Sequence, residues 1–347
     1  MVQKIILDDV TCKGDLYPFD VVRSVLDIRV GILTLREKWD TLTKNNYTTV
    51  GERTKMLGNE LLVEANVIPT ISWFKQMQKD NKTPAIQLIH PWHIFQTNTK
   101  NIIDDFELLC QGRVSASISE SNKLVNQQDI FLEEGAVVEH CVINASEGPV
   151  YIGKNALVME GCMLRGPVAI CKSSVIKMGA KIYGGTTIGP FCVAAGEIKN
   201  SIMFGYSNKA HDGYLGDAVI AEWCNLGAGT SNSNLKNTAG VVKAWKNKRQ
   251  SFIEVGLKCG LLMGDYSRCA INTSFNTGTV VGVCSNIFGA GFPAKYIPDF
   301  TWGIESYKFE KVIADIDNWK KLKGQLITET EIKLLTDIYS KQNLRYA

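Results

Sequence analysis

The sequence lacks several features that would place a chain in a familiar functional class. Its 38 basic side chains are balanced by 35 acidic ones, which leaves a formal net charge of +3. A protein that binds a phosphate backbone usually gathers a basic excess on one face, so nucleic acid is not the expected partner. No apolar run approaches the roughly 18 residues of a membrane-spanning helix. The N-terminus "MVQKIILDDV" reaches two carboxylates before a signal-peptide core could form, so we expect a cytoplasmic protein with no membrane partner.

Metal-ligand and disulfide patterns are missing as well. The ten cysteines include no CxxC pair, and no two of the four histidines have zinc-like spacing with a third ligand. In a chain of 347 residues, this argues against both a zinc ribbon and a disulfide framework. We expect reduced, mostly buried thiols, and a hydrophobic content of 45% suits two ordinary domains with their own cores.

What the sequence does contain is a repeat of six residues. Aliphatic side chains recur over seven consecutive hexads, at Ile152, Val158, Leu164, Ile170, Ile176, Ile182 and Ile188. A small or modest side chain follows each of them by four positions. This period is neither the 2 of a strand nor the 3.6 of a helix, and it is typical of a coil with three flat faces. It predicts a left-handed parallel β-helix of hexapeptide repeats, with Cys162, Cys192 and Cys224 in its core and no bound metal.

The repeat lapses twice, over residues 197–215 and 232–250, and looser apolar spacing continues beyond the second lapse. Insertions in a solenoid leave its surface as loops, which often carry function. We therefore expect two inserted loops. The densest basic run of the chain, with Lys246, Lys248 and Arg249, falls in the second lapse and is expected to be solvated.

The segments on either side of the repeat have other patterns. Residues 1–112 predict a small α/β domain, with a buried strand in "KIILDD" and a helix that Thr99 caps and Gly112 ends. Residues 113–300 are expected to form the β-helix, and residues 301–347 a C-terminal helical tail in two segments around Gly324. Thr328 and Glu331 have the spacing of a capping box for the second segment.

One histidine stands out as a candidate base. A prism filled with aliphatic columns leaves no internal cavity, so an active site has to lie where a loop meets another coil or another chain. His211 lies in the first lapse among polar residues, with Asn225 about one coil further on. An imidazole whose ordinary pKa is about 6.5 can take a proton from an amine or hydroxyl near neutral pH. The alternative is a polar group at a bend without a chemical role.

Longer motifs carry a resemblance to a known family. "KAHDGYLGDAVIAEWCNLGAGTSNSN" resembles the acetyltransferase domain of the GlmU family, whose bifunctional members acetylate glucosamine-1-phosphate from acetyl-CoA and then uridylylate the product. "MGAKIYGGTTIGP", "GYSNKAHDGYLG" and "INTSFNTGTVVGV", together with "DLYPFDVVRSVLDIRVGILTLREKW", are similar to GlmU-like sugar nucleotidyltransferases over nearly the whole chain. The resemblance implies acetyl-CoA as donor and a homotrimer with sites between subunits.

The resemblance also implies roles for single residues. It makes His211 the catalytic base. It assigns four residues to the sugar substrate: Lys199, Tyr214, Asn225 and Lys181, the last near an expected arginine. It assigns another four to acyl-CoA, namely Asn234, Gly227, Gly229 and Lys258. It also implies that the pantetheine arm of CoA lies along the coils past Gly289 to Gly291. The pattern differs from that of the relatives at Val193 and Leu235, which suggests a changed sugar pocket.

For the N-terminal domain, the family has a domain about twice as long that opens with a Gly-rich phosphate-binding loop. The nearest equivalent here is "RVGILTLREK", which makes Arg29, Gly31 and Lys38 the candidates for nucleotide binding. Retained nucleotidyl transfer would also need Mg²⁺, close to Asp8 or Asp9.

Three functions remain open from the sequence. The leading hypothesis is acyl transfer from acyl-CoA to an amino sugar phosphate or a nucleotide sugar. The second is a sugar-1-phosphate nucleotidyltransferase that uses UTP or dTTP. The third is a regulatory or scaffold protein that binds nucleotide sugars without catalysis.

Overall fold

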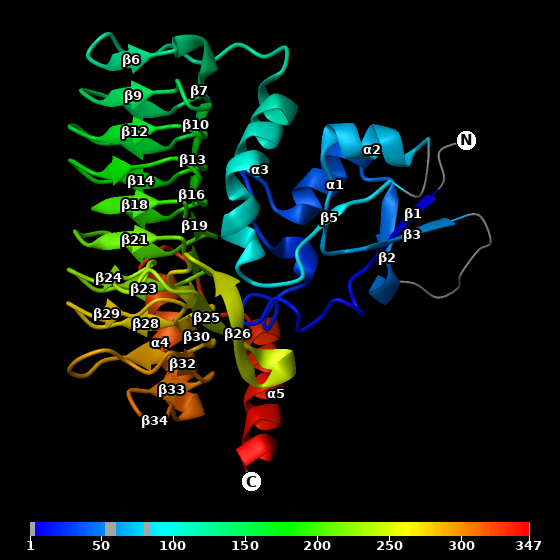
Figure 1. Ribbon diagram of the computed structural model, residues 1–347, viewed down its shortest axis with the longest axis vertical. Coiled ribbons are helices and arrows are strands. Elements are labelled where there is room, and N and C mark those ends of the chain that lie inside the picture. Colours follow the sequence, from blue (N-terminus) through cyan, green and yellow to red (C-terminus); the bar gives the residue numbers. More distant parts are fainter. Residues whose placement is uncertain (1–3, 53–59, 80–82, 347) are drawn as a thin grey trace.

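The computed structural model describes residues 4–52, 60–79 and 83–346, and its main feature is a tall parallel β-helix (Figure 1). Each coil places one short strand on each of three faces, and strands of successive coils pair in parallel. The predicted fold class is confirmed: a small α/β region precedes the β-helix, and helices follow it.

The first face is a nine-stranded sheet. Its strands are β7 (Ile130–Leu132), β10 (Val150–Ile152), β13 (Val168–Ile170), β16 (Thr186–Ile188), β19 (Ile202–Met203), β22 (Val219–Ile220), β27 (Leu262–Met263), β30 (Val280–Val281) and β32 (Tyr296–Ile297).

The second face has ten strands: β8 (Val137–Val138), β11 (Leu157–Val158), β14 (Val175–Ile176), β17 (Val193–Ala194), β20 (Asn208–Lys209), β23 (Asn225–Leu226), β28 (Arg268–Cys269), β31 (Asn286–Ile287), β33 (Thr301–Trp302) and β34 (Glu305–Ser306). The third face contains β6 (Lys123–Val125), β9 (Val142–Asn144), β12 (Met163–Arg165), β15 (Lys181–Ile182), β18 (Glu197–Lys199) and β21 (Tyr214–Gly216), and the paired strands β24 (Ser231–Asn232) and β29 (Ser274–Phe275) continue it.

The hexad side chains fill the interior as the repeat predicts. The seven aliphatic positions from Ile152 to Ile188 are all at most 2% exposed, because each coil stacks its aliphatic residue on that of the previous coil. The predicted core cysteines Cys162, Cys192 and Cys224, which lie at the small positions of the repeat, are buried as well. All ten cysteines are free thiols, and nine of them are buried.

The two lapses in the repeat have different structures. The second is a true insertion, a hairpin of β25 (Val242–Lys246) and β26 (Ser251–Gly256) that leaves the coil between β24 and β27. The first is not an insertion, since β17, β20 and β23 pair in uninterrupted succession. The expectation of an inserted loop at 197–215 is therefore wrong, and the repeat loses its phase there because one coil is shortened.

The N-terminal region packs sideways against the β-helix (Figure 1). Its parallel sheet has the order β2 (Tyr47–Thr49), β1 (Lys4–Asp8), β3 (Glu60–Glu64), and a small antiparallel pair joins β4 (Val67–Ile68) to β5 (Ile86–Gln87). Its helices are α1 (Leu35–Thr43), α2 (Ile71–Met77) and α3 (His93–Cys110). The helix expected after a cap at Thr99 thus begins about two turns earlier, with Trp92 at its N-cap position.

Helix α3 joins the two parts of the chain. It runs along the first face beside β13, β16 and β19 (Figure 1). Asn98 on α3 donates to the backbone oxygen of Gly185 and to the hydroxyl of Thr187, at 2.8 and 3.0 Å. One hydrophobic cluster extends from the N-terminal sheet into the β-helix columns. The division at residue 112 stays a prediction, and the core is continuous across it.

The inserted hairpin also holds the N-terminal region in place. The ammonium of Lys246 is buried and donates to the backbone oxygens of Asp15 and Ile89, at 2.7 and 2.8 Å. Lys246 was expected in a solvated loop, and that expectation is wrong. Lys248, which forms an exposed ion pair with Asp15, agrees better with the expected solvated loop.

Two helices complete the fold, α4 (Phe309–Lys321) and α5 (Glu329–Tyr346). The capping box predicted for the second is present: the Thr328 hydroxyl accepts from the Glu331 amide, and the Glu331 carboxylate accepts from the Thr328 amide. Across the parts of the chain that the structure describes, no helix combines the length and apolar content needed to cross a membrane.

The lowered pKa of His90 makes the stability of this arrangement depend on pH. Burial, together with the nearby charges of Lys246, His93 and Arg249, lowers the pKa of His90 to about 4 from an ordinary 6.5. The unfolded chain therefore binds a proton at His90 from pH 6.5 downward while the folded chain does not. The unprotonated His90 therefore costs the fold no stability above pH 6.5, and the free energy of unfolding declines as the pH falls from 6.5 towards 4.

We expect the urea midpoint of the wild type to fall between pH 6.5 and 5, and that of His90→Gln to fall less steeply. The exposed histidine His140 provides the matched control, because His140→Gln should keep the wild-type slope. Equal slopes for His90→Gln and the wild type would contradict this account.

Candidate functional site

His211 lies on the edge of the prism where the second and third faces meet. It belongs to the four-residue corner 210–213 between β20 and β21, and its side chain is exposed. The corners 227–230 and 270–273 of the next two coils follow along the same edge. We call this line of corners the His211 edge.

The corner of His211 protrudes because the coil before it is short. Ala194 pairs with Lys209, and Ile198 pairs with Leu215. The inward position on the third face therefore follows that on the second face by four residues in one coil and by six in the next. Gly196 makes this close approach possible, since a Cβ there would lie 2.7 Å from the Gly213 oxygen. His211 is thus exposed by a two-residue shortening of its neighbour, without an insertion of its own.

A cleft of about 450 Å³ opens beside this corner. His211, Asn225 and Gly227 all line it, so the structure brings together three residues that the sequence proposed separately. Val193, where the family pattern differs, lines it too. The remaining lining residues are Asn208, Ala210, Leu226, Ala228, Ile271 and Trp319. An exposed imidazole beside a side-chain amide can accept a proton from a polar substrate in this cleft.

Three predicted sugar-binding residues lie around the corner, on the third face. Lys181 and Tyr214 occupy the same outward-facing column, with Glu197 between them. Lys199 is exposed on the neighbouring strand position, and its ammonium lies 5.9 Å from the centre of the Tyr183 ring. This surface combines two lysines with aromatic side chains.

Tyr214 and Asn234 belong to one polar network. The Asn234 side-chain amide donates to the Tyr214 hydroxyl at 3.2 Å and to the Asp217 carboxylate at 2.5 Å. Asp217 also accepts from Asn200, at 2.6 Å. Burial and the charge of Asp217 raise the pKa of Tyr214, which therefore stays a neutral hydroxyl at physiological pH. The network fixes the direction in which Tyr214 presents its ring.

The backbone amides of Gly227 and Gly229, two of the residues assigned to acyl-CoA, already donate within the protein. The Gly227 amide donates to the Cys269 oxygen, and the Gly229 amide donates to the Asp212 oxygen, each at 3.1 Å. Gly229 also lies outside the residues that line the cleft. Its role is structural, because it has a φ of +73° and a Cβ there would overlap the Asn272 side chain. Oxyanion stabilisation by these two amides is therefore not available in this arrangement.

A larger groove of about 850 Å³ continues along the edge. Gly289 and Gly291 line it, as do the apolar side chains of Phe288 and Phe292. The cleft and the groove both reach corner 270–273, since Ile271 lines the first and Thr273 the second. Lys258 lines neither of them. It forms a bridge with Leu235, the second position where the family pattern differs.

The structure gives the nucleotide-binding candidates other partners. Lys38 is 1% exposed and forms an ion pair with the buried Asp105 of α3. Arg29 is buried, donates to the Ile32 oxygen and pairs with Glu37 at 3.5 Å. These contacts turn both charges towards the protein, so the arrangement does not favour a role in phosphate binding.

Gly31 is equally enclosed. Its amide donates to Asn98 at 2.7 Å, and its oxygen accepts from the Thr187 hydroxyl at 2.9 Å. The segment "RVGIL" thus forms the joint between α3 and β16. Burial raises the pKa of Asp105 and lowers that of Lys38, and their mutual attraction opposes both shifts.

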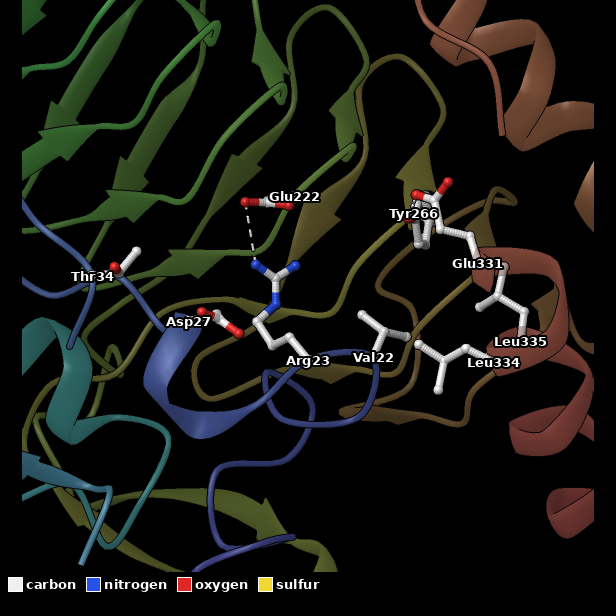
Figure 2. A pocket seen from close by; sticks show the side chains of 9 residues that line it. All are labelled: Val22, Arg23, Asp27, Thr34, Glu222, Tyr266, Glu331, Leu334 and Leu335. Atoms are coloured by element: carbon white, nitrogen blue, oxygen red, sulfur yellow. Dashed lines mark hydrogen bonds and ion pairs between the residues drawn. The ribbon is translucent and has the colours of Figure 1, made fainter. Parts of the chain in front are cut away.

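A cavity of about 300 Å³ lies where the N-terminal region, the β-helix and α5 meet (Figure 2). Arg23 reaches across it to Glu222 at 3.3 Å and also pairs with Asp265. Burial raises the pKa of Asp265 to about 6 despite this arginine. Glu331 of α5 lies opposite and pairs with Lys320. The charges compensate one another, which is typical of a structural junction.

Within the described ranges, no three histidine, cysteine or acidic side chains are grouped so that they could hold a metal ion. Near the predicted magnesium position, Asp8 accepts from the amides of Val10 and Thr11, and one buried oxygen of Asp9 has no protein partner. Mg²⁺ is often held by only one or two carboxylates and the phosphates of its substrate. Asp9 is thus the residue that fits such an ion.

The sequence places Asn208 and Lys209 among the polar residues that flank His211 but gives them no role, and it does not reveal Trp319. Asn208 lines the cleft, and Trp319 brings α4 to its wall. Lys209 points inward and donates to the oxygens of Ala195 and His211. Burial lowers the pKa of Lys209 to about 8. Recognition of the shortened coil would have placed Lys209 in a core column, whereas nothing in the sequence places Trp319 there.

Comparisons with known proteins find relatives of this chain by sequence. Residues 4–79 match a family model described as sugar nucleotidyl transferase. The bifunctional protein GlmU of Methanocaldococcus jannaschii is 28% identical over 279 residues, which cover 74% of this chain and 60% of that protein. A bifunctional sugar-1-phosphate nucleotidylyltransferase/acetyltransferase of Sulfurisphaera tokodaii is 27% identical over 223 residues, which cover 61% of this chain and 48% of that protein.

The chain thus spans at most about three fifths of the length of these relatives. An Arabidopsis UDP-N-acetylglucosamine acyltransferase structure covers 66% of this chain and 91% of its own, at 14% identity and a TM-score of 0.22, a likeness too weak to support an argument. The sequence matches extend over both the N-terminal region and the β-helix. They confirm the resemblance: this chain is similar to GlmU proteins in sequence.

Proposed function

We propose that this chain transfers an acetyl or related acyl group from CoA to the amino group of a sugar phosphate or nucleotide sugar. The observation that carries the proposal is the cleft on the His211 edge, in which an exposed imidazole lies beside Asn225. The similarity to bifunctional relatives supports it, since one of them is named as an acetyltransferase.

In the proposed reaction, His211 takes a proton from the substrate amine as its nitrogen attacks the thioester carbonyl. The C–N bond forms, the C–S bond breaks, and the imidazolium returns the proton to the leaving CoA thiolate. The demand on the protein is modest because a thioester is already activated. Asn225 lies in the same cleft and can hydrogen-bond the substrate.

The surfaces around His211 suggest where each substrate binds. The apolar groove by Phe288 and Phe292 suits the pantetheine arm, which would reach His211 over corner 270–273. Lys199 and Lys181 on the third face suit the phosphate of the acceptor, and Tyr214 suits its sugar ring. We further propose a homotrimer, in which a neighbouring copy covers the third face.

The test is to incubate the protein with acetyl-CoA and a panel of amino sugar phosphates and nucleotide-linked amino sugars. We expect at least one acceptor to gain the mass of one acetyl group, and light scattering to give three times the mass of the chain. Calorimetric titration with acetyl-CoA separates this proposal from a non-catalytic scaffold, because an acyltransferase has to bind its donor. Absence of both binding and product would contradict it.

A second activity has separate support. The family match at residues 4–79 favours sugar-1-phosphate nucleotidyl transfer by the N-terminal region. Its Mg²⁺ would neutralise phosphate charge, and Asp9 is the residue that would hold it. Pyrophosphate release from UTP or dTTP with a panel of sugar phosphates tests this activity. No release with any sugar would leave the region a structural support.

A further inference from the structure

Lys209 is a charged residue in an apolar column. The inward positions of the second face are occupied from coil to coil by aliphatic, small or thiol side chains: Val138, Val158, Ile176, Ala194, Leu226, Cys269 and Ile287. Lys209 pairs with Ala194 in this column and is 2% exposed. An ammonium buried among such neighbours is costly unless its hydrogen bonds are made. Its presence therefore calls for a local partner.

The partners are two backbone oxygens at the His211 edge. The Lys209 ammonium donates to the Ala195 oxygen at 3.2 Å and to the His211 oxygen at 2.9 Å. Ala195 belongs to the corner that is two residues short. The ammonium thus links that shortened corner to the protruding corner of the next coil.

The protruding corner makes further backbone contacts at the two residues that follow His211. The Asp212 oxygen accepts from the Gly229 amide, and the Gly213 oxygen accepts from the Glu197 amide. The described side chains include no partner for the imidazole itself, and among them Lys209 alone binds the His211 backbone. Loss of this bond would release the peptide that carries the imidazole.

We propose that Lys209 is a positioning residue for His211, whose backbone it holds from inside the prism so that the imidazole keeps its place in the cleft. The role in catalysis rests on the proposed acyl transfer, whereas the anchoring of the corner does not. A packing role alone would be met by any unbranched apolar side chain.

The test compares Lys209→Met, which keeps the length and removes the donor, with Lys209→Gln, which keeps a neutral donor. We expect Lys209→Met to lower kcat about tenfold or more, because a small displacement of a catalytic group is costly. KM for both substrates should change less than about twofold, and Lys209→Gln should recover part of the loss. Ile176→Met, a substitution in the same column, is the matched control and should keep kcat.

Hydrogen exchange gives a readout that does not depend on activity. Peptides covering residues 208–216 should exchange faster in Lys209→Met than in the wild type, while peptides from the earlier coils stay unchanged. Unchanged exchange at 208–216, or a wild-type kcat in Lys209→Met, would overturn the proposal. Faster exchange in a protein that shows no acyl transfer would retain the anchoring role and refute the proposed function.

Discussion

Replacement of His211 by alanine is expected to lower kcat for acyl transfer by about 10²- to 10⁴-fold, the usual contribution of a general base. The imidazole is exposed at a corner of the prism and its ring contributes nothing to the apolar columns. We therefore expect the thermal midpoint and the oligomeric state to stay those of the wild type. Initial rates of acetylated product, with light scattering of both proteins, measure the two effects.

The β-helix itself offers a matched control. His140 is an exposed histidine on the same edge, at the corner between β8 and β9 several coils earlier. His140→Ala should acetylate at the wild-type rate. A rate in His211→Ala within a few-fold of the wild type would remove His211 as the base, and an equal loss in His140→Ala would show that the effect is not local.

The second large effect concerns stability. Asp105→Ala should lower the free energy of unfolding by about 3–5 kcal/mol, because it leaves the buried Lys38 ammonium without a partner. It also removes the acceptor of the Ile32 and Leu33 amides. Urea unfolding followed by circular dichroism measures the loss.

An exposed ion pair supplies the comparison. Lys154 and Glu134 lie 3.0 Å apart with side chains 55% and 85% exposed, and Lys154→Ala should cost less than about 1 kcal/mol. If Asp105→Ala were no more destabilising than Lys154→Ala, the Lys38–Asp105 pair would not hold the N-terminal region. Lys38 would then again be a candidate for binding phosphate.

The β-helix could be predicted because its repeat is local and strict. The buried aliphatic positions from Ile152 to Ile188 follow directly from the period of six, and the burial of Cys162 and Cys192 follows from their small positions in the repeat. The capping box of Thr328 could also be predicted from the sequence, since a cap depends only on residues within one turn.

Features that depend on distant partners could not be predicted in the same way. Arg29 and Lys38 look like phosphate ligands in the sequence, because nothing there reveals that Asp105 neutralises Lys38 from another helix. The lapse at 197–215 looks like an insertion, because a coil with a corner two residues short shifts the phase as an inserted loop does. His211 was nevertheless correctly placed at the surface, although for a different geometrical reason.

The central claim is that the cleft on the His211 edge is an acyl-transfer site. Its most direct test is the release of CoA thiol from acetyl-CoA, followed with and without each amino sugar acceptor, in the wild type and in His211→Ala side by side. The account predicts release that depends on the acceptor in the wild type and is lost in His211→Ala. Release that is absent with every acceptor, or equal in the two proteins, would contradict it.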